Sequence, residues 1–457
     1  MLWMPHLDTT SRNLAGALAD RLEADIRTGT LRPGEKLPPQ RELADHLGVN
    51  LSTVTRAFKA CELKGLIHGV VGRGTFVSLD ARVSLSLAEN TSGLIDMGQV
   101  LPLPALDYLV AQQVQGLLPE LPLESLIRYP APEGLPAHRE AGARWLGTLG
   151  LLAKPEAVVI TPGSQSALTC ALLALFTPGD RIAVDALTYP GIKSLAALTG
   201  MRLVPVEADA QGLSADALRQ LCRSESIKGI YLMPECHNPT TRAMSPGRRE
   251  ALAEVIRAFD LVLLEDDAYG YTGDPSSLPV SRLAPDQGIY LGGTAKLLGP
   301  GFRITYAAVP PRYREPFRRG LLNTAWMASP ITAALTSALL NNGGAAHIQE
   351  ARRAEAQALN RLAEKTLHPW SPQLRPCGFF QWLPLPPPWT GQQFELAARE
   401  KGVRIFSAEK FAVGGGSLKA AVRIALTGTE NRAQLEKGLK VIRELLVQGP
   451  GEGAGLL

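Results

Sequence analysis

Short, uninterrupted apolar runs recur through most of the chain and constrain its fold more than any other feature. Residues 157–160 read AVVI, residues 229–233 GIYLM and residues 261–266 LVLLED, and segments of helical length separate such runs. Strands without polar alternation are typical of a sheet that helices cover on both faces. We therefore expect a large α/β domain over residues 97–446, with a smaller α+β subdomain mainly in residues 325–446.

The first part of the chain, residues 12–77, follows a helical pattern instead. Leucines and an isoleucine recur every four residues over 14–26, which predicts an amphipathic helix. Two shorter helices are predicted over 40–47 and 52–64, separated by a turn that contains Gly48. Two helices joined in this way form a helix-turn-helix, whose second helix can enter the major groove of DNA.

The segment after the third helix predicts a β-hairpin with a basic tip. Residues 66–77 read LIHGVVGRGTFV, and Arg73 stands between two glycines at the turn. A basic hairpin beside a recognition helix is a wing, so we expect this unit to bind double-stranded DNA. The net charge of +4 is too small to imply nucleic acid by itself. A small helical interaction module that contacts no DNA is the alternative.

Composition excludes several other classes of protein. Five cysteines without a C-x-x-C pair argue against a disulfide framework and against zinc, so no metal is expected. No run of about 20 apolar residues suggests a membrane span, and the first residues lack the pattern of a secretory signal, which predicts a cytoplasmic location. Residues 78–96 read as a linker and residues 447–457 as a disordered tail.

Candidate ligand-binding residues follow several predicted strands. TPGSQSA, at 161–167, opens a helix whose backbone N–H groups can bind a phosphate; a plain N-cap is the alternative. Asp266 ends LVLLED, and a carboxylate in such a crevice requires a cation or a protonated ring nitrogen. Asp267 is expected to be a solvated loop acid. Lys296 lies among glycines, where a desolvated amine becomes a nucleophile, and Arg303 can bind phosphate or carboxylate.

Six motifs carry a resemblance to a known family. In chain order they are TPGSQSA (161–167), ALTYPG (186–191), HNPT (237–240), EDDAY (265–269), GGTAKLLGPGFR (292–303) and AVRIA (421–425). This order resembles that of fold-type I, aspartate-aminotransferase-like proteins, which bind pyridoxal 5′-phosphate. Residues 37–77 resemble a GntR-type winged helix, and the two parts joined in this order resemble the MocR subfamily of bacterial transcriptional regulators.

The resemblance implies a role for each matching residue. Lys296 would form a Schiff base with pyridoxal 5′-phosphate, Asp266 would pair with its pyridinium nitrogen, and Arg423 would bind the carboxylate of an effector or substrate. The other cofactor contacts would come from Asn238, Tyr269, Tyr189, Ser164, Gln165, Arg303 and, in a homodimer, from Tyr129 of the second subunit. The DNA contacts would come from Arg41, Ser52, Thr53, Arg56 and Arg73.

The chain departs from the family pattern in two places. Gly293 and Ala295 stand where the family usually has serines, so two hydroxyl groups that could contact the phosphate are missing. Leu51 stands where arginine is common in the recognition helix, which removes one DNA contact. The first departure puts the affinity for the cofactor in question, and the second bears on DNA specificity.

Three functions fit these features. The first is a homodimeric regulator that binds promoter DNA and responds to pyridoxal 5′-phosphate, to an amino acid or to an amine. The second is a catalytically active aminotransferase with a winged-helix head, because a lysine base and Arg423 are both present. The third is a degenerate domain without cofactor, against which Lys296 and Asp266 argue. The regulator is favoured, because an enzyme has no evident need for a winged helix.

Overall fold

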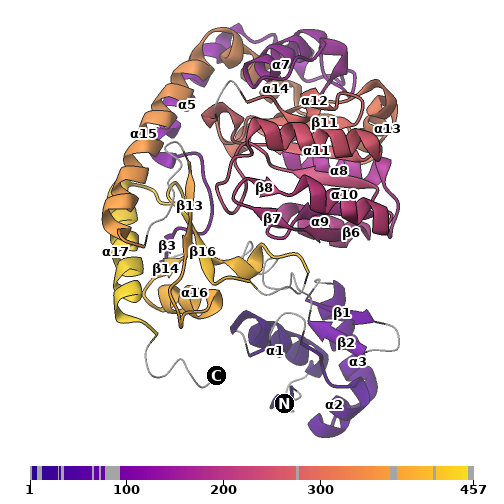
Figure 1. Cartoon of the computed structure of the whole chain (residues 1–457), viewed down its shortest axis with the longest axis vertical. Helices are drawn as coiled ribbons and strands as arrows, with labels where there is room; N and C mark the ends of the chain where they lie inside the picture. The colour runs from indigo at the N-terminus through magenta and orange to yellow at the C-terminus, as the bar shows by residue number, and fades with distance from the viewer. Residues whose placement is uncertain are drawn as a thin grey trace. The chain divides into compact units, whose positions relative to one another are not determined.

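Two compact units make up the protein. The computed structural model describes residues 3–7, 13–28, 30–31, 35–63, 66–70, 74–77, 93–273, 277–370, 378–414 and 418–450. The first unit holds the described residues up to Val77, and the second holds those from Gly93 onward. Their buried residues fall into separate core clusters, and Figure 1 shows the helices and strands of each unit.

The first unit consists of three helices and a β-hairpin. Its helices are α1 (Leu14–Thr28), α2 (Gln40–Leu47) and α3 (Leu51–Leu63), and its antiparallel strands are β1 (Ile67–Val70) and β2 (Gly74–Val77). Gly48 ends α2 with a φ of 62°, a left-handed conformation that glycine adopts easily. The predicted helix-turn-helix and hairpin are therefore confirmed. Residues 71–73, and with them Arg73, lie outside the described residues.

A seven-stranded sheet forms the centre of the second unit (Figure 1). The strand order is β4–β12–β11–β10–β9–β5–β6; β12 runs antiparallel to both of its neighbours, and the other neighbouring pairs are parallel. The strands are β4 (Val158–Thr161), β5 (Arg181–Asp185), β6 (Arg202–Val206), β9 (Gly229–Leu232), β10 (Val262–Asp267), β11 (Gly288–Gly293) and β12 (Thr305–Ala308).

Helices cover both faces of this sheet, as the apolar runs predict. Val262 and Leu264 of β10 join the core cluster that contains residues of α8 (Ser164–Leu175), whereas Leu263 joins the cluster that contains residues of α11 (Pro246–Ala258). Successive side chains of a strand point to opposite faces, so both faces of β10 are buried. None of the described helices is long and apolar enough to cross a membrane.

Further elements complete this part of the chain. The helices are α5 (Asp107–Leu117), α6 (Leu123–Leu126), α7 (Pro136–Thr148), α9 (Pro190–Thr199), α10 (Ala215–Ser224), α12 (Val280–Leu283), α13 (Pro311–Leu322) and α14 (Pro330–Asn341). A short hairpin joins β7 (Ala208–Asp209) to β8 (Gly212–Leu213). The hairpin was not predicted, because strands of two residues leave no periodicity in the sequence.

The C-terminal part forms a smaller α+β layer. Its antiparallel sheet has the order β13 (Phe380–Pro384), β16 (Ala421–Ala425), β15 (Phe406–Ser407). The helices are α15 (Gly344–Leu367), α16 (Gly391–Glu400) and α17 (Arg432–Gln448). Arg423 lies in the middle strand, between β13 and β15, and its side chain is buried.

The beginning of the second unit returns to this smaller layer. β3 (Ile95–Asp96) pairs in parallel with β14 (Val403–Arg404), and Arg404 Nη1 lies 2.9 Å from Asp96 Oδ2. Residues 93–96, which the sequence places in the linker, therefore belong to the second unit. At the other end α17 extends to Gln448, two residues into the predicted tail. Residues 78–92 and 451–457 lie outside the described residues.

The separate cores lead to a prediction about stability. Leu22 of α1 is fully buried in the core of the first unit, and its replacement by alanine should destabilise that unit by about 2–5 kcal/mol, because apolar contacts are lost and a cavity is left. The second unit should change by less than ~0.5 kcal/mol. Hydrogen exchange with mass spectrometry measures both units at once. Leu198→Ala, at an 82% exposed position of α9, is the control. Equal loss of protection in both units would contradict the prediction.

Candidate functional site

Asp266 lies at the carboxyl end of β10 and is 5% exposed. The hydroxyl of Tyr231 donates a hydrogen bond of 2.9 Å to Oδ2, whereas Oδ1 has no hydrogen-bond partner among the described residues. Burial raises the pKa of Asp266 to about 6, and the hydrogen bond from Tyr231 opposes this rise. The free oxygen of a buried carboxylate is suited to accept a hydrogen bond from a cationic donor.

Asp267 requires a correction, because it is not a solvated loop acid. It is 8% exposed, and it accepts a hydrogen bond from the hydroxyl of Tyr290. Burial raises the pKa of Asp267 to about 7, and the charges of Glu235 and Glu265 contribute to this rise. The expectation was wrong because β10 extends through Asp267, and both of the last two residues of the strand are buried.

Lys296 follows β11, and both its side chain and its backbone form hydrogen bonds. Its Nζ donates a hydrogen bond of 2.5 Å to the backbone oxygen of Val100, and its own backbone oxygen accepts one of 2.6 Å from the hydroxyl of Tyr271. Burial lowers the pKa of Lys296 to about 8, with the positive charge of Arg423 as the second cause. A fraction of the amine is therefore unprotonated near neutral pH, as a nucleophile requires.

Two tyrosines lie near these charged groups. The hydroxyl of Tyr189 donates a hydrogen bond of 3.3 Å to Gln165 Oε1, and Gln165 Nε2 donates one of 3.1 Å to the backbone oxygen of Gly191. Burial, and then the charge of Asp266, raises the pKa of Tyr189 to about 12. Tyr269 packs against aromatic rings of the smaller layer, and burial raises its pKa as well. Both tyrosines therefore remain neutral.

The loop before α8 forms a small cationic cradle. Arg303 Nη2 donates a hydrogen bond of 3.0 Å to the backbone oxygen of Pro162. Gly163 has a φ of 87°, and a Cβ placed there would lie 2.6 Å from Arg303 Nη2, so a side chain would displace the guanidinium. Ser164 begins α8, and its hydroxyl lies 3.1 Å from that of Thr305. A helix N-terminus with an arginine and hydroxyl groups can bind a phosphate.

Gly293 lies beside this cradle. A Cβ added at Gly293 would approach Ser164 Oγ to 3.0 Å and Thr305 Oγ1 to 3.7 Å. Two hydroxyl groups therefore already occupy the neighbourhood in which the resemblance expects the serine that this chain lacks. The sequence did not reveal Thr305, because it is paired with Gly293 only through the register of β11 and β12.

Arg423 reaches the same region from β16. Its Nη1 donates a hydrogen bond of 2.7 Å to Asn238 Oδ1, and its Nη2 donates one of 2.5 Å to the backbone oxygen of Gly98. Its guanidinium carbon lies 4.8 Å from the ring centre of Phe411. Burial lowers the pKa of Arg423 to about 10, which still leaves the group charged at neutral pH. A buried guanidinium in this position can bind a carboxylate.

Tyr129 lies apart from these groups. It is 79% exposed, and its ring centre lies 5.8 Å from that of Trp326. Within the described part of the chain, no hydrogen bond or ring contact joins Tyr129 to Lys296, Asp266 or Arg303. This exposed position leaves Tyr129 accessible to a second subunit.

The predicted DNA-binding residues of α2 and α3 lie at the surface of the first unit. Arg41 stands in the first turn of α2, and Ser52 and Arg56 are exposed one turn apart on α3, with Thr53 half-buried. The hydroxyl of Thr55 donates a hydrogen bond of 2.8 Å to the side chain of Gln40, which the sequence did not reveal. This bond ties the beginnings of α2 and α3 together. The bond joins Gln40, the neighbour of Arg41, to Thr55, the neighbour of Arg56.

Comparison with known proteins identifies the family. The model of aminotransferase class I and II matches residues 109–442, and that of bacterial regulatory proteins of the gntR family matches residues 14–77. The uncharacterized HTH-type transcriptional regulator YdeF of Bacillus subtilis is 36% identical, covering 98% of this chain and 97% of the relative. The probable rhizopine catabolism regulatory protein MocR of Rhizobium meliloti is 27% identical and covers 74% of each chain. The chain is a MocR-type regulator.

A MocR-type regulator combines a GntR-type head with an aminotransferase-like domain, for which pyridoxal 5′-phosphate is the cofactor. A solved structure of LysN, the α-aminoadipate aminotransferase of Thermus thermophilus, complexed with N-(5′-phosphopyridoxyl)-L-leucine, is 26% identical. Its TM-score is 0.69, and the match covers 79% of this chain and 95% of that one. The residues present here fit the cofactor, because the free oxygen of Asp266 can accept a hydrogen bond from a ring N–H.

The burial of Asp266 leads to a prediction with opposite effects on stability and on binding. Its pKa is raised in the folded protein, so its contribution to stability is present below about pH 4 and is lost as the pH rises through about 6. Without cofactor, Asp266→Asn should therefore be more stable than the parent at pH 7.5 by up to about 3 kcal/mol, and equally stable near pH 4. It should also bind pyridoxal 5′-phosphate at least tenfold more weakly.

Denaturant unfolding at the two pH values, and titration with the cofactor, measure these effects. Asp216→Asn, at a side chain that is 85% exposed, is the matched control. A variant that is less stable than the parent at pH 7.5 and binds the cofactor normally would contradict the assignment of Asp266.

Proposed function

We propose that this MocR-type regulator acts in the cytoplasm as a homodimer, binds promoter DNA through α2, α3 and the hairpin, and controls that binding through the cofactor site. The observation that carries the proposal is the coexistence in one chain of an exposed recognition helix with Arg56 and a buried cluster of Lys296, Asp266 and Arg423. An amino acid or an amine is the expected effector.

In this proposal each buried residue has a physical role toward the cofactor. Pyridoxal 5′-phosphate, when bound, supplies an electron-withdrawing ring and an aldehyde that reacts with amines. Lys296, whose pKa is lowered to about 8, provides the amine. Asp266 accepts a hydrogen bond from the ring nitrogen through Oδ1, Tyr189 packs on the ring, and Arg303 binds the phosphate with Ser164.

The remaining residues complete the same site. Asn238 and Tyr269 hydrogen-bond the phenolic oxygen of the ring, and Gln165 joins the phosphate contacts. Arg423 binds the carboxylate of the effector. Asn238 already accepts a hydrogen bond from Arg423, so the arginine is positioned by a group of the cofactor site itself. This arrangement favours a ligand that carries both an amine and a carboxylate.

The contacts of Lys296 and Arg423 support coupling to the head. Both side chains donate to backbone oxygens of one short segment, Lys296 to Val100 and Arg423 to Gly98. That segment is where the chain enters the second unit from the side of the linker. A carboxylate bound by Arg423 would replace the hydrogen bond to Gly98. Ligand binding would therefore change how strongly the second unit stabilises the conformation of residues 97–101.

An exposed apolar surface supports the homodimer. Tyr129 and Trp326 contact each other and are exposed, and Leu118, Leu123 and Ile127 are exposed earlier in the same stretch of chain. Exposed large apolar side chains that gather in one stretch of chain are typical of subunit interfaces. A second copy would cover it and bring Tyr129 toward a phosphate in the neighbouring site.

Selection of DNA by the full-length protein from a random pool tests the function. The proposal predicts enrichment of a repeated half-site at moderate salt, and no enrichment would overturn it. A catalytically active aminotransferase is the second candidate, because Lys296 and Arg423 suit transamination. Many turnovers with an amino donor and a keto acid would favour that candidate; reaction with an amine that stops after a single event favours the regulator.

The exposed face of α3 leads to a prediction about affinity. Arg56→Ala should weaken binding to the selected DNA about tenfold, because a phosphate or base-edge contact is lost. If Arg56 contacts phosphate, the slope of log affinity against log salt should also fall by about one. Fluorescence anisotropy with labelled DNA measures both quantities. Arg202→Ala, at an exposed position of β6 in the second unit, should change neither. Unchanged affinity in Arg56→Ala would remove α3 from the DNA contacts.

A further inference from the structure

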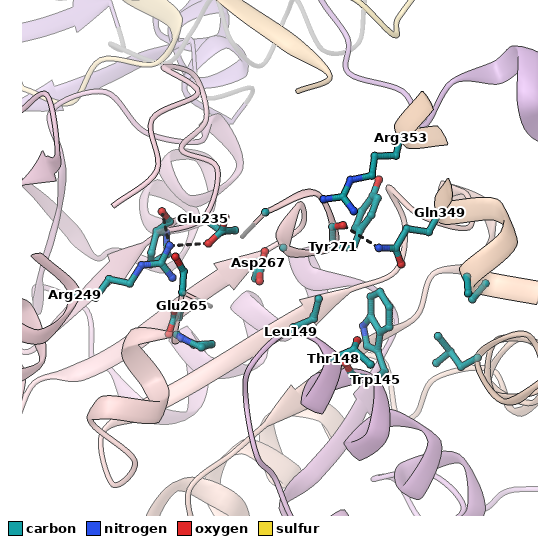
Figure 2. A pocket seen from close by; sticks show the side chains of 18 residues that line it. Trp145, Thr148, Leu149, Glu235, Arg249, Glu265, Asp267, Tyr271, Gln349 and Arg353 are labelled. Carbon is teal, nitrogen blue, oxygen red and sulfur yellow. Dashed lines mark hydrogen bonds and ion pairs between the residues drawn. The ribbon is translucent and has the colours of Figure 1, made fainter. Parts of the chain in front are cut away.

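A cavity of about 190 Å³, with both polar and apolar residues in its lining, lies at the carboxyl end of β10 (Figure 2), and Asp266 is not among the lining residues. Asp266 and Asp267 are consecutive residues of the strand, so their side chains point to opposite faces of the sheet. Engineered cavities of about 150 Å³ take up benzene, so this volume suffices for a small organic molecule. The lining residues include Trp145, Leu149, Glu235, Glu265, Asp267 and Tyr271.

Asp267 places a buried carboxyl group at this cavity, beside the backbone N–H of Gly270. It is 8% exposed; Oδ2 accepts a hydrogen bond from the hydroxyl of Tyr290, and Oδ1 has no hydrogen-bond partner among the residues that the structure describes. A buried carboxylate oxygen without a partner costs free energy, and a cationic hydrogen-bond donor removes that cost.

The other two carboxylates of the cavity already have partners, and Arg353 is a further charged residue of its lining. Glu235 forms a buried ion pair of 2.6 Å with Arg249 (Figure 2). Glu265 accepts hydrogen bonds from the backbone N–H groups of Val280 and Ser281. Asp267 is therefore the carboxylate toward which a ligand cation would be attracted.

A second group without a partner in the described part of the chain belongs to Trp145, which also lines the cavity. Trp145, in α7, is 6% exposed, and its indole N–H has no hydrogen-bond partner within the described segments. This group can only donate, so it requires an acceptor oxygen. In Figure 2 Leu149 lies between Asp267 and Trp145, and Leu340 is another apolar residue of the lining. These two polar groups would suit a short molecule that has a hydrogen-bond donor at one end, for Asp267, and an acceptor at the other, for Trp145.

We propose that this cavity is a second ligand site, for a small primary amine that carries an oxygen acceptor, with the ammonium group at Asp267 and the acceptor oxygen at the indole N–H of Trp145. The site is distinct from the cofactor site and is linked to it through Tyr271. That residue lines the cavity, and its hydroxyl donates to the backbone oxygen of Lys296. A ligand in the cavity therefore contacts a residue that holds the lysine in place.

Calorimetric titration with ethanolammonium chloride tests the proposal. The full-length protein is first treated with borohydride, so that an amine cannot exchange at a cofactor bound to Lys296. The proposal predicts a saturable heat at matched ionic strength, and ethylene glycol, which has the same size and no charge, should give none. If Lys296 carried no cofactor, the treatment would change nothing and the titration would still measure the cavity, so the two proposals can fail separately.

Variants assign the binding to the cavity. Asp267→Asn retains the shape of the side chain and should weaken ethanolammonium binding at least tenfold, because the charge is lost. Trp145→Phe retains the ring and should weaken it about threefold to tenfold, and it serves as the second variant if Asp267→Asn fails to fold. Asp216→Asn, at an 85% exposed side chain, should bind as the parent does.

Two results would overturn the proposal. One is the absence of saturable heat in the parent protein, which would mean that the cavity holds water only. The other is parental affinity in both Asp267→Asn and Trp145→Phe, which would place the amine elsewhere on the protein.

Discussion

A sheet covered by helices on both faces cannot solvate a charge, and this constraint organises the second unit. Three charged residues, Asp266, Asp267 and Lys296, stand at or just beyond strand ends and lie within a few residues of buried apolar runs. Burial displaces the pKa of each of them, upward for the two acids and downward for the lysine. Burying these groups costs the folded protein free energy. A ligand that supplies the missing hydrogen-bond or charge partner removes part of that cost and therefore binds more tightly.

The same site is closed by parts of the chain that are distant in sequence. Val100 accepts from Lys296 across 196 positions, and Arg423 donates to Gly98 across 325. These bonds depend on the pairing of β3 with β14, which brings the beginning of the second unit to the smaller layer. The segment that follows the connection to the DNA-binding unit is thus hydrogen-bonded to Lys296 and Arg423, which is why we favour a regulator whose cofactor site affects the head.

The sequence predicted those parts of the fold that depend on local pattern. The apolar runs located the sheet, the four-residue spacing located α1, and the strand ends pointed to Asp266 and Lys296. Contacts set by register or by distant pairing could not be predicted: Thr305 lies beside Gly293 only because β11 and β12 are paired, and Tyr231 reaches Asp266 from a neighbouring strand. Asp267 was misjudged, because a strand's last buried residue and the first residue of a loop look alike in sequence.

The central claim is that occupation of the cofactor site changes the affinity of the head for DNA. Anisotropy measurements on one selected DNA sequence, with the full-length protein saturated with pyridoxal 5′-phosphate and freed of it, test this directly. The account predicts at least a fivefold difference, the lower end of usual couplings between sites, and its loss in Lys296→Ala. Equal affinities with and without the cofactor in the parent protein would contradict it.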